Sequence, residues 1–356
     1  MNNGIYIHIP FCLSKCAYCD FNSKAGALSM AEDYIAALIG EMEMFKGVGA
    51  DSVYLGGGTP TVLSCGLLEK LLCAVNGIFK LSGDTEFTVE SNPATADFNK
   101  YRLLREYGVN RLSIGVQSFL DNELKALSRI HSAEDGEKAV NEARKAGFDN
   151  IGIDLMEGIP CQSVESLSYS LNKAISLGTK HMSVYSLIIE EGTPFYENTP
   201  KLPDEDVERE MYKTVKKVLS ENGFSHYEIS NYAKEGYRSR HNTKYWTREP
   251  YYGFGAGAHS FYGGVRYENI CDIKGYIMAE NKTAGKTAIS EKEAEYERFM
   301  LGFRMLDGFD TKGFFPEKIE KLEKEGLIVR EGTYARLSER GEDLANLVFM
   351  EFLGDD

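Results

Sequence analysis

Three cysteines near the start of the chain, Cys12, Cys16 and Cys19, form a C-x3-C-x2-C triplet directly after the apolar segment 5–10. Three thiolates on one short loop can bind three irons of a cubane 4Fe–4S cluster, and the fourth iron then has no cysteine ligand. An iron with an open position can bind and cleave a ligand. A three-cysteine zinc site is the alternative, but zinc sites normally use C-x2-C pairs or Cys/His sets. The spacing therefore predicts a 4Fe–4S cluster.

The cysteines follow the first of six short β-rich segments, and a helical pattern follows each segment. The segments are Ile5–Ile9, Ser52–Leu55, Glu86–Glu90, Arg111–Val116, Asn150–Leu155 and His181–Leu187. Strands that alternate with helices in this way indicate βα units with parallel strands. Six units in succession predict an α/β fold of the partial-barrel type, and a doubly wound open sheet is the alternative.

Residues typical of helix ends separate these strands. Ser29 begins a capping box, S-M-A-E, which predicts an amphipathic helix to about Phe45. Further N-caps are expected at Asp97, Ser132 and Ser163. Glycines that end helices are expected at Gly108, Gly147 and Gly178. Helices between these ends would return the chain from one parallel strand to the next.

The βα rhythm ends near residue 200, so we expect three parts in the chain. A helix that ends at Asn222 is followed by aromatic and glycine-rich segments. The tail shows two amphipathic runs, a short β-like pair and a closing helix, at Glu293–Leu306, Pro316–Lys324, Gly326–Leu337 and Glu339–Phe352. The expected division is a barrel over 1–200, a barrel-associated segment over 201–285 and a small helical, winged-helix-like domain over 286–356.

Polar or glycine residues lie at the C-terminal end of every predicted strand, where a βα barrel builds its binding face. After the cysteine loop, these ends carry Gly56–Thr61, Glu90-Ser91-Asn92, Gln117-Ser118, Asp154 and Glu190-Glu191. Consecutive glycines allow the backbone to approach a ligand closely. Each feature alone has an ordinary structural explanation, such as a strand-exit turn or a capped strand end. Their occurrence at six strand ends favours a ligand site.

The triplet, with the aromatic Tyr18 before its last cysteine, resembles that of radical S-adenosylmethionine proteins. Longer segments resemble their oxygen-independent coproporphyrinogen III oxidase family: Tyr6–Cys12, Gly56–Thr61, Glu90–Pro93, Gly115–Phe119, Ser128–His131 and Asp154–Pro160. The resemblance implies a partial (β/α)6 barrel with a 4Fe–4S cluster and S-adenosylmethionine. By this likeness, the positions that bind S-adenosylmethionine are Tyr6, Tyr18, Gly57, Gly58, Thr59, Glu90, Gln117, Arg129 and Asp154.

Within that family the chain is similar to the HemW-type haem chaperone branch. Phe21 stands where the oxidases have another cysteine, and the cluster loop begins at position 12 without the oxidases' N-terminal extension. Residues 241–246 read H-N-T-K-Y-W and match the H-N-x-x-Y-W motif of the chaperones. The likeness implies a protein that binds haem as cargo and passes it to haem proteins such as respiratory enzymes.

The H-N-x-x-Y-W segment also has residue types that suit haem. A neutral imidazole is a common iron ligand, and aromatic side chains can cover a porphyrin face. The expected haem residues are His241, Tyr245 and Trp246. A core tryptophan beside a hydrogen-bonded histidine is the alternative, and His259 is a reserve ligand.

Two functions from different classes follow from these features. The first is a haem chaperone that carries a cluster and S-adenosylmethionine. The second is an oxygen-independent coproporphyrinogen III dehydrogenase, which would decarboxylate propionate side chains by radical chemistry that its cofactor supplies. Phe21, the short N-terminus and the His241 motif favour the first. Radical chemistry on another tetrapyrrole, such as haem degradation, is a third option, and whether the chain catalyses any reaction stays open.

Composition and charge narrow the setting. The 356 residues carry a formal net charge of −14, which argues against a nucleic-acid partner. No apolar stretch approaches the roughly 20 residues that span a bilayer, and the N-terminus lacks the pattern of a signal peptide. The other cysteines, Cys65, Cys73, Cys161 and Cys271, have no paired spacing, so we expect buried, reduced thiols and a cytoplasmic protein.

Overall fold

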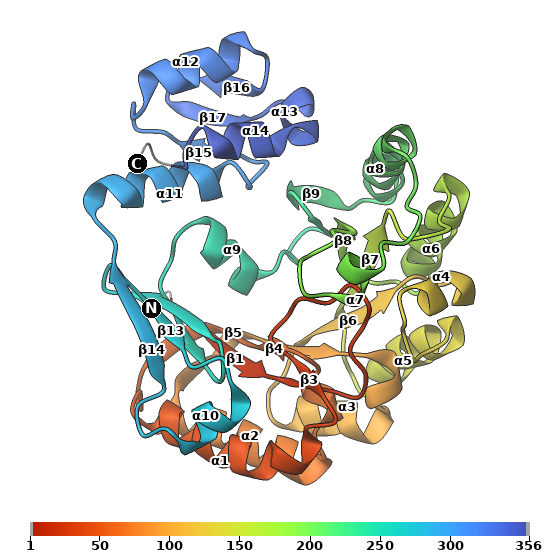
Figure 1. The fold of residues 1–356 in the computed structure, drawn as a ribbon, viewed down its shortest axis with the longest axis vertical. Helices are drawn as coiled ribbons and strands as arrows, with labels where there is room; N and C mark the ends of the chain where they lie inside the picture. Colours follow the sequence, from red (N-terminus) through yellow and green to blue (C-terminus); the bar gives the residue numbers. More distant parts are fainter. Residues whose placement is uncertain (1–2, 354–356) are drawn as a thin grey trace.

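The computed structural model describes residues 3–353, and its centre is a sheet built on six parallel strands (Figure 1). These strands are β1 (Gly4–Ile9), β4 (Gly49–Gly57), β5 (Lys80–Ser91), β6 (Arg111–Gln117), β7 (Asn150–Glu157) and β8 (His181–Ser186). Each pairs in parallel with the next in chain order. All six coincide with segments expected from the sequence, and the partial (β/α)6 barrel is confirmed.

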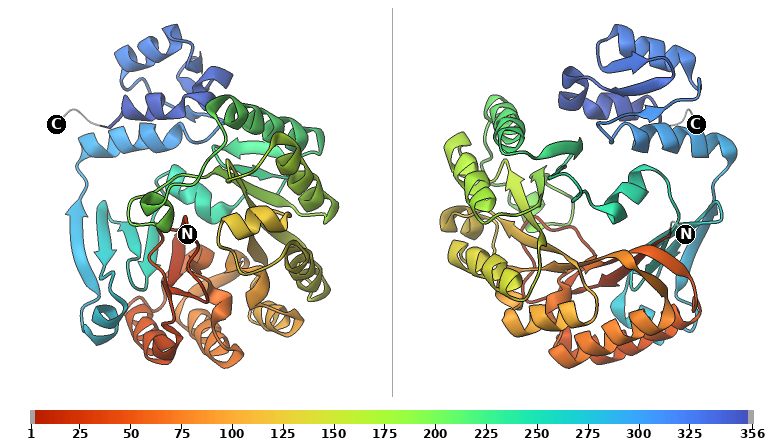
Figure 2. Two further views of the ribbon diagram at one scale, coloured as in Figure 1. Left: turned by 45° about the vertical axis from the view of Figure 1, so that its right-hand side comes forward. Right: turned by 180° about the vertical axis from the view of Figure 1, so that it is seen from behind.

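Helices cover the outer surface of this curved sheet, as all three views show (Figures 1 and 2). They are α1 (Ala31–Glu43), α2 (Cys65–Ile78), α3 (Phe98–Glu106), α4 (Asp121–Ala126), α5 (Ala133–Lys145), α6 (Val164–Ser176) and α8 (Glu205–Glu221). Strand alternation decides which side chains meet them. On β1, Ile5, Ile7 and Ile9 are fully buried in the main hydrophobic core, whereas Tyr6 and His8 line a cavity.

Three of the predicted helix caps are confirmed and one is wrong. The side chains of Asp97, Ser132 and Ser163 accept hydrogen bonds from the first turns of α3, α5 and α6. Ser29 caps nothing, because it lies inside a short 3-10 turn, Leu28–Met30, and α1 begins after Met30 without a side-chain cap. The local S-x-x-E pattern was therefore correct about a helix but wrong about its first residue.

Further strands that the sequence pattern did not predict extend the sheet at both edges. On the β1 side lie β11 (Tyr251–Phe254), β12 (His259–Tyr262), β13 (Val265–Asn269) and β14 (Thr283–Ala288), and on the β8 side lie β10 (Asn231–Ala233) and β9 (Ser225–Glu228). β11 is parallel to β1, and the others are antiparallel to their neighbours. These strands are short and rich in aromatic residues, so they lack a clear alternating pattern. The sheet is therefore mixed.

Short elements complete the barrel region. The cluster loop leaves β2 (Phe11–Cys12), which pairs with β3 (Lys24–Ala25), and the turns η2 (Pro60–Val62) and η3 (Pro93–Thr95) follow β4 and β5. The helices are α7 (Pro194–Glu197), α9 (Arg240–Trp246) and α10 (Ile273–Met278). In the views, α9 lies between the sheet and the C-terminal elements, and it contacts α11.

The C-terminal elements form a small helical unit with its own hydrophobic core (Figure 1). Its elements are α11 (Glu291–Gly302), β15 (Phe309–Asp310), α12 (Pro316–Lys324), β16 (Ile328–Glu331), β17 (Tyr334–Leu337), α13 (Glu339–Asp343) and α14 (Ala345–Met350). Compared with the prediction, α11 begins two residues earlier and ends at Gly302. The expected closing helix is broken at Leu344 into α13 and α14.

The prediction of buried thiols outside the triplet is wrong, because Cys65, Cys73, Cys161 and Cys271 are all exposed. On α2, the stripe that faces the sheet consists of Leu68, Leu71, Leu72 and Val75, so position 73 points away from it. Cysteine spacing alone does not carry this information. No helix in the described part of the chain is long and apolar enough to cross a membrane.

Candidate functional site

A cavity of about 340 Å³ lies at the C-terminal ends of the parallel strands. All three triplet cysteines line it, and the loop that carries them connects β2 to β3. Most of the residues expected to bind S-adenosylmethionine line the same cavity, namely Tyr18, Gly57, Gly58, Thr59, Glu90, Gln117, Arg129 and Asp154. The fold thus gathers residues from six strand ends into one site.

Each cysteine of the triplet is half-buried and held in place by a neighbour. The Sγ of Cys12 lies 3.8 Å from the Thr59 hydroxyl, and Nη1 of Arg129 lies 3.4 Å from the Sγ of Cys16. The backbone N–H of Cys19 donates to the Cys16 carbonyl at 3.2 Å. The Thr59 hydroxyl, the Arg129 guanidinium and the loop's own backbone thus fix where the three cysteines lie.

The donor set fits a cluster better than a single ion. Among residues 3–353, no three His, Cys, Asp or Glu side chains converge on one point, as one metal ion would require. A cubane differs because each thiolate binds a separate iron, so the sulfurs surround a volume. Three thiols around an open cavity, with the Arg129 guanidinium against one of them, agree with that requirement.

Gly57, the last residue of β4, and Gly58 directly after it are needed for close packing between strands. Gly57 has φ +108°, and a Cβ there would lie 2.4 Å from the His8 ring. A Cβ on Gly58 would lie 2.7 Å from the Phe11 carbonyl oxygen. The amides of Gly57, Gly58 and Thr59 all donate within the protein, to Glu90, Ile9 and Phe11. Only glycine fits at these two positions, as a strand-exit turn requires, and both glycines also line the cavity.

Two carboxylates on the inner face of the sheet have altered acidity. The Glu90 carboxylate accepts from the Tyr54 hydroxyl at 2.7 Å and the Gly57 amide at 3.0 Å, yet burial raises its pKa to about 7. Burial also raises the pKa of Asp154, whose carboxylate accepts from the Ser113 hydroxyl at 3.0 Å. A bound cation would favour the ionised form of both groups.

Gln117 and Arg129 occupy unusual positions. Gln117 ends β6 with φ +68°, a left-handed conformation that costs a non-glycine residue about 1–2 kcal/mol. Its side chain accepts from the Tyr185 hydroxyl at 2.8 Å. Nη2 of Arg129 donates to the Asn92 side chain at 2.8 Å and also to the Gly115 carbonyl. Arg129 is therefore anchored at the cavity wall rather than extended into solvent.

The sequence analysis placed Asn92 at a strand end without a role and did not single out Ser113 and Tyr185, and all three line the cavity. Asn92 joins two expected residues, because its amide donates to the Thr59 hydroxyl at 2.7 Å and its oxygen accepts from Arg129. Strand alternation could have identified Ser113 and Tyr185. They lie two residues from Gly115 and Ser183 on the inward-facing rows of β6 and β8.

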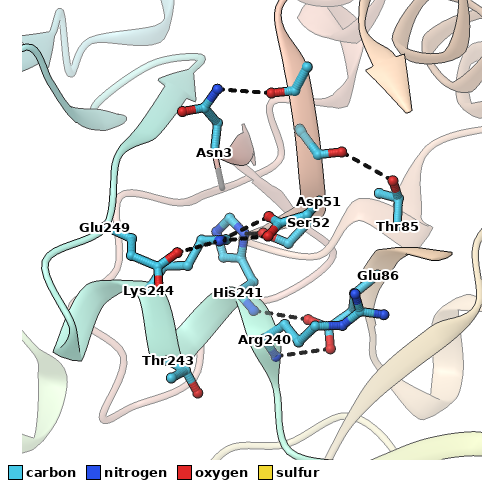
Figure 3. Close-up of polar contacts among 12 residues, drawn as sticks. Asn3, Asp51, Ser52, Thr85, Glu86, Arg240, His241, Thr243, Lys244 and Glu249 are labelled. Carbon is cyan, nitrogen blue, oxygen red and sulfur yellow. Dashed lines mark hydrogen bonds and ion pairs between the residues drawn. The ribbon is translucent and has the colours of Figure 1, made fainter. Parts of the chain in front are cut away.

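The residues expected to bind haem do not share a cavity. His241 lies on α9, only 1% exposed, near the N-terminal ends of β1 and β4 (Figure 3). Its Nδ1 is 3.0 Å from the Ser52 hydroxyl and its Nε2 is 2.9 Å from the Tyr245 hydroxyl. The Glu86 carboxylate accepts from its backbone amide at 3.0 Å. Burial, and then the positive charge of Lys244, lower the pKa of His241 to about 3.

Tyr245 and Trp246 point to different surroundings. Tyr245 lines a second cavity together with Tyr6, and its ring meets Tyr251 edge-on with centroids 4.7 Å apart. Trp246 lies under the guanidinium of Arg304, which follows α11 and is 4.1 Å from the indole centroid. Tyr6 is the one expected S-adenosylmethionine residue that lines this second cavity rather than the first.

Family models match the two ends of the chain. Residues 6–171 match the radical SAM superfamily, and residues 289–344 match the HemN C-terminal domain. The first match contains the triplet and most of the cavity lining, and the second falls within the small helical unit.

Full-length relatives carry one name. The chain is 40% identical to the heme chaperone HemW of Bacillus subtilis, over 98% of this chain and 99% of that protein. It is 36% identical to the heme chaperone HemW of Lactococcus lactis, over 99% and 98%, and 33% identical to that of Escherichia coli, over 99% and 98%.

A solved structure shows the same fold. Coproporphyrinogen III oxidase (HemN) from Escherichia coli, a radical SAM enzyme, superposes with a TM-score of 0.87 at 22% identity, over 99% of this chain and 90% of that chain. At this identity the likeness shows the fold alone. The sequence matches to the heme chaperones, in contrast, are 33–40% identical over almost the whole length of both proteins. The chain belongs to the HemW family of heme chaperones, with a radical SAM barrel and a HemN-type C-terminal domain.

Proposed function

We propose that this protein binds haem as cargo and delivers it to haem-accepting proteins, of which respiratory enzymes are the expected class. The observation that carries the proposal is the 33–40% identity to heme chaperones over almost the whole length of both partners. Identity to the structurally similar coproporphyrinogen III oxidase is 22%. Phe21, which replaces a cysteine of the oxidase pattern, is 62% exposed and lines the main cavity. The oxidase alternative is therefore not favoured.

The main cavity is the proposed site of a 4Fe–4S cluster and S-adenosylmethionine. Cys12, Cys16 and Cys19 would hold the cluster, which supplies an iron with an open coordination position. The carboxylates of Glu90 and Asp154 can accept from the ammonium group or the ribose hydroxyls of S-adenosylmethionine. The remaining proposed contacts are Tyr6, Tyr18, Gly57, Gly58, Thr59, Gln117 and Arg129. A cluster with an open iron needs a reducing compartment, which supports a cytoplasmic location.

The proposed division into domains is a barrel over 1–200, an associated segment over 201–285 and a winged-helix-like domain over 286–356. The separate hydrophobic core that runs from Phe299 to Phe352 supports the last boundary. The associated segment supplies α9 and the strands β9–β14 to the barrel sheet, so it is proposed as a part of the barrel rather than an independent folding unit.

Haem delivery can be tested with membranes from cells starved of haem, whose respiratory enzymes lack it. Reconstituted protein loaded with haem is mixed with these membranes, and oxygen consumption is followed. We expect activity to appear faster than with the same amount of haem on serum albumin, because a chaperone lowers the barrier to transfer. Equal rates from the two haem sources would contradict delivery.

A further inference from the structure

A second cavity, of about 360 Å³, adjoins the main one and has an aromatic wall. Phe21, Gly57 and Glu90 line both cavities. The wall consists of Tyr6 on β1, Tyr245 on α9 and Tyr251 on β11. Flat aromatic side chains are the surface that a porphyrin ring packs against. None of the proposed functions of the main cavity uses this wall, apart from Tyr6.

The histidines differ in whether the ring reaches the second cavity and in whether a ring nitrogen is free to bind iron. An imidazole needs a nitrogen with a free lone pair to act as a ligand. Among the six histidines, all within residues 3–353, only His8 and His259 line the second cavity, and both ring nitrogens of His8 are hydrogen bonded, to the Tyr6 hydroxyl and the Asn22 carbonyl. His259 is exposed, its side chain makes no hydrogen bond within the described residues, and it lines the second cavity.

His241, in contrast, has both ring nitrogens occupied. Binding an iron would require its ring to leave the Ser52 and Tyr245 hydroxyls and the stacked Tyr54 ring, whose centroid lies 5.3 Å away. Two buried hydrogen bonds would then be lost without replacement, which opposes binding of an iron by this ring. The buried position of His241 thus suits a structural role, although it belongs to the motif expected to bind haem.

The backbone around His259 is fixed by close strand contacts. A Cβ on Gly253 would lie 2.0 Å from the His259 carbonyl oxygen, so only glycine lets β11 and β12 approach this closely. Gly257 meets Asn22 in the same way, with 2.5 Å between a Cβ and the side-chain nitrogen. Asn22 donates to the carbonyls of Ala256 and Cys271, which ties the segment after the cluster loop to the turn before His259. The imidazole is therefore presented from a rigid support.

The rim of the second cavity offers an aromatic ring for the porphyrin and a cation for the propionates. The exposed Phe21 ring can pack on the porphyrin, and Nζ of Lys15 donates to the Phe21 carbonyl at 3.1 Å, so one cation lies beside it. Glu90 lies in both cavities, and its carboxylate would repel a propionate. This charge pattern favours propionates that point outward, towards Lys15 and solvent.

We propose that the second cavity is the haem site, with His259 as the iron ligand and Tyr6, Tyr245, Tyr251 and Phe21 as the surface for the porphyrin. The imidazole donates a nitrogen lone pair to the iron, and no other bond changes. The proposal rests on the proposed haem-binding function, because that function names the cargo. It places the cargo beside the cluster loop, with Phe21 common to both cavities.

The test is a titration of the anaerobically reconstituted full chain with haemin, followed by Soret difference spectra and by electron paramagnetic resonance of the ferric iron. His259→Ala should bind haemin about ten-fold more weakly or worse and lose the histidine-ligated spectrum. Added imidazole should restore that spectrum in the variant. Because His259 is exposed, the variant should keep its fold, which circular dichroism and cluster content will verify.

His241→Gln is the matched control, because glutamine can keep hydrogen bonds to Ser52 and Tyr245. It should bind haemin as the wild type does. An unchanged spectrum and affinity in His259→Ala, or weaker binding with an unchanged iron spectrum, would overturn the site while leaving haem binding itself intact. A wild-type protein that binds no haemin would overturn both the site and the proposed function.

Discussion

Side chains at the main cavity are bonded to one another before any ligand arrives. Arg129 connects Cys16, Asn92 and the Gly115 carbonyl, and Asn92 in turn holds Thr59, whose hydroxyl is near Cys12. The cysteine loop is therefore linked to the ends of β4, β5 and β6 through polar contacts. Pre-positioning of this kind reduces what a ligand must order on binding.

Replacement of one triplet cysteine tests the assignment of the cluster. Cys16→Ala should lose most of the iron and sulfide that the reconstituted protein holds, because two thiolates cannot replace three. Iron and sulfide analysis measures the loss. Cys161→Ala is the control, since Cys161 is exposed outside the triplet and should leave the content unchanged. Full cluster content in Cys16→Ala would refute the assignment.

Glu157 should make stability depend on pH. Burial raises its pKa from 4.5 to about 7, and only the Ser186 hydroxyl, 2.9 Å away, bonds its carboxylate. The folded state thus keeps a proton that the unfolded chain releases near pH 4.5. Its stabilising contribution is complete below that pH and is lost as pH rises through 7, by about 3 kcal/mol in total.

Thermal unfolding of cluster-free protein between pH 4.5 and 8.5 measures this effect. Glutamine does not titrate, so the stability of Glu157→Gln should increase relative to that of the wild type as pH rises. Glu221→Gln, on an exposed position at the end of α8, serves as the control and should follow the wild type. A constant difference between Glu157→Gln and wild type across this range would show that Glu157 does not titrate as described.

At the scale of elements, the short helix α9 is held against the sheet by buried polar contacts. The Ser239 side chain caps its first turn, and the Glu86 carboxylate accepts from the amides of Arg240 and His241 at 3.0 Å each (Figure 3). Lys244 pairs with Asp51 at 2.9 Å and with Glu249 at 2.8 Å. A seven-residue helix is not stable alone, so these contacts fix its place.

Ser52→Ala tests whether His241 has a structural role in this packing. The variant leaves Nδ1 of the buried ring without its partner and should lower the free energy of unfolding by about 1–2 kcal/mol. Denaturant unfolding measures the change. Affinity for haemin should not change, because His259 is the proposed ligand. Ser220→Ala, at an exposed position of α8, is the control for loss of an exposed hydroxyl, and a Ser52→Ala variant as stable as this control would contradict the structural role.

Sequence reasoning predicted the repeating elements well and the irregular ones poorly. The six parallel strands were predictable because each is an apolar run followed by an amphipathic helix with an N-cap such as Ser132 or Ser163. Strands β9–β14 were missed, since each is only three to six residues long and lacks a clear alternating pattern. The inner rows that carry Ser113 and Tyr185 could have been predicted from alternation, but their convergence with Arg129 depends on the curvature of the sheet.

The sequence alone could not show which histidine rings are enclosed and which are exposed. His241 lies in the segment that resembles the chaperone motif, yet its hydrogen bonds to Ser52 and Tyr245 come from positions 189 residues and four residues away. Only the fold shows that its ring is enclosed and that His259 is open. A motif identifies which residues matter in a family, whereas exposure decides which of them can reach a ligand.

At the scale of the whole molecule, the C-terminal unit is attached to the barrel around α9. Arg304 covers the Trp246 ring, Nε of Arg248 pairs with Glu297 at 2.9 Å, and Arg238 pairs with Asp307. In Figure 1 this unit lies beyond α9, and Glu342 on α13 also pairs with Lys216 on α8, at 2.5 Å. The molecule thus combines a barrel shared with an oxidase and a haem-binding role proposed from its relatives.

One measurement addresses that combination directly. Reduced, reconstituted protein with S-adenosylmethionine is offered an equimolar mixture of haem and coproporphyrinogen III and is then desalted, and the tetrapyrroles in the protein fraction and in the filtrate are identified by chromatography and mass. We predict haem in stoichiometric amount with the protein and unaltered coproporphyrinogen III in the filtrate. Decarboxylated porphyrinogen in either fraction, or a protein fraction without haem, would contradict the account.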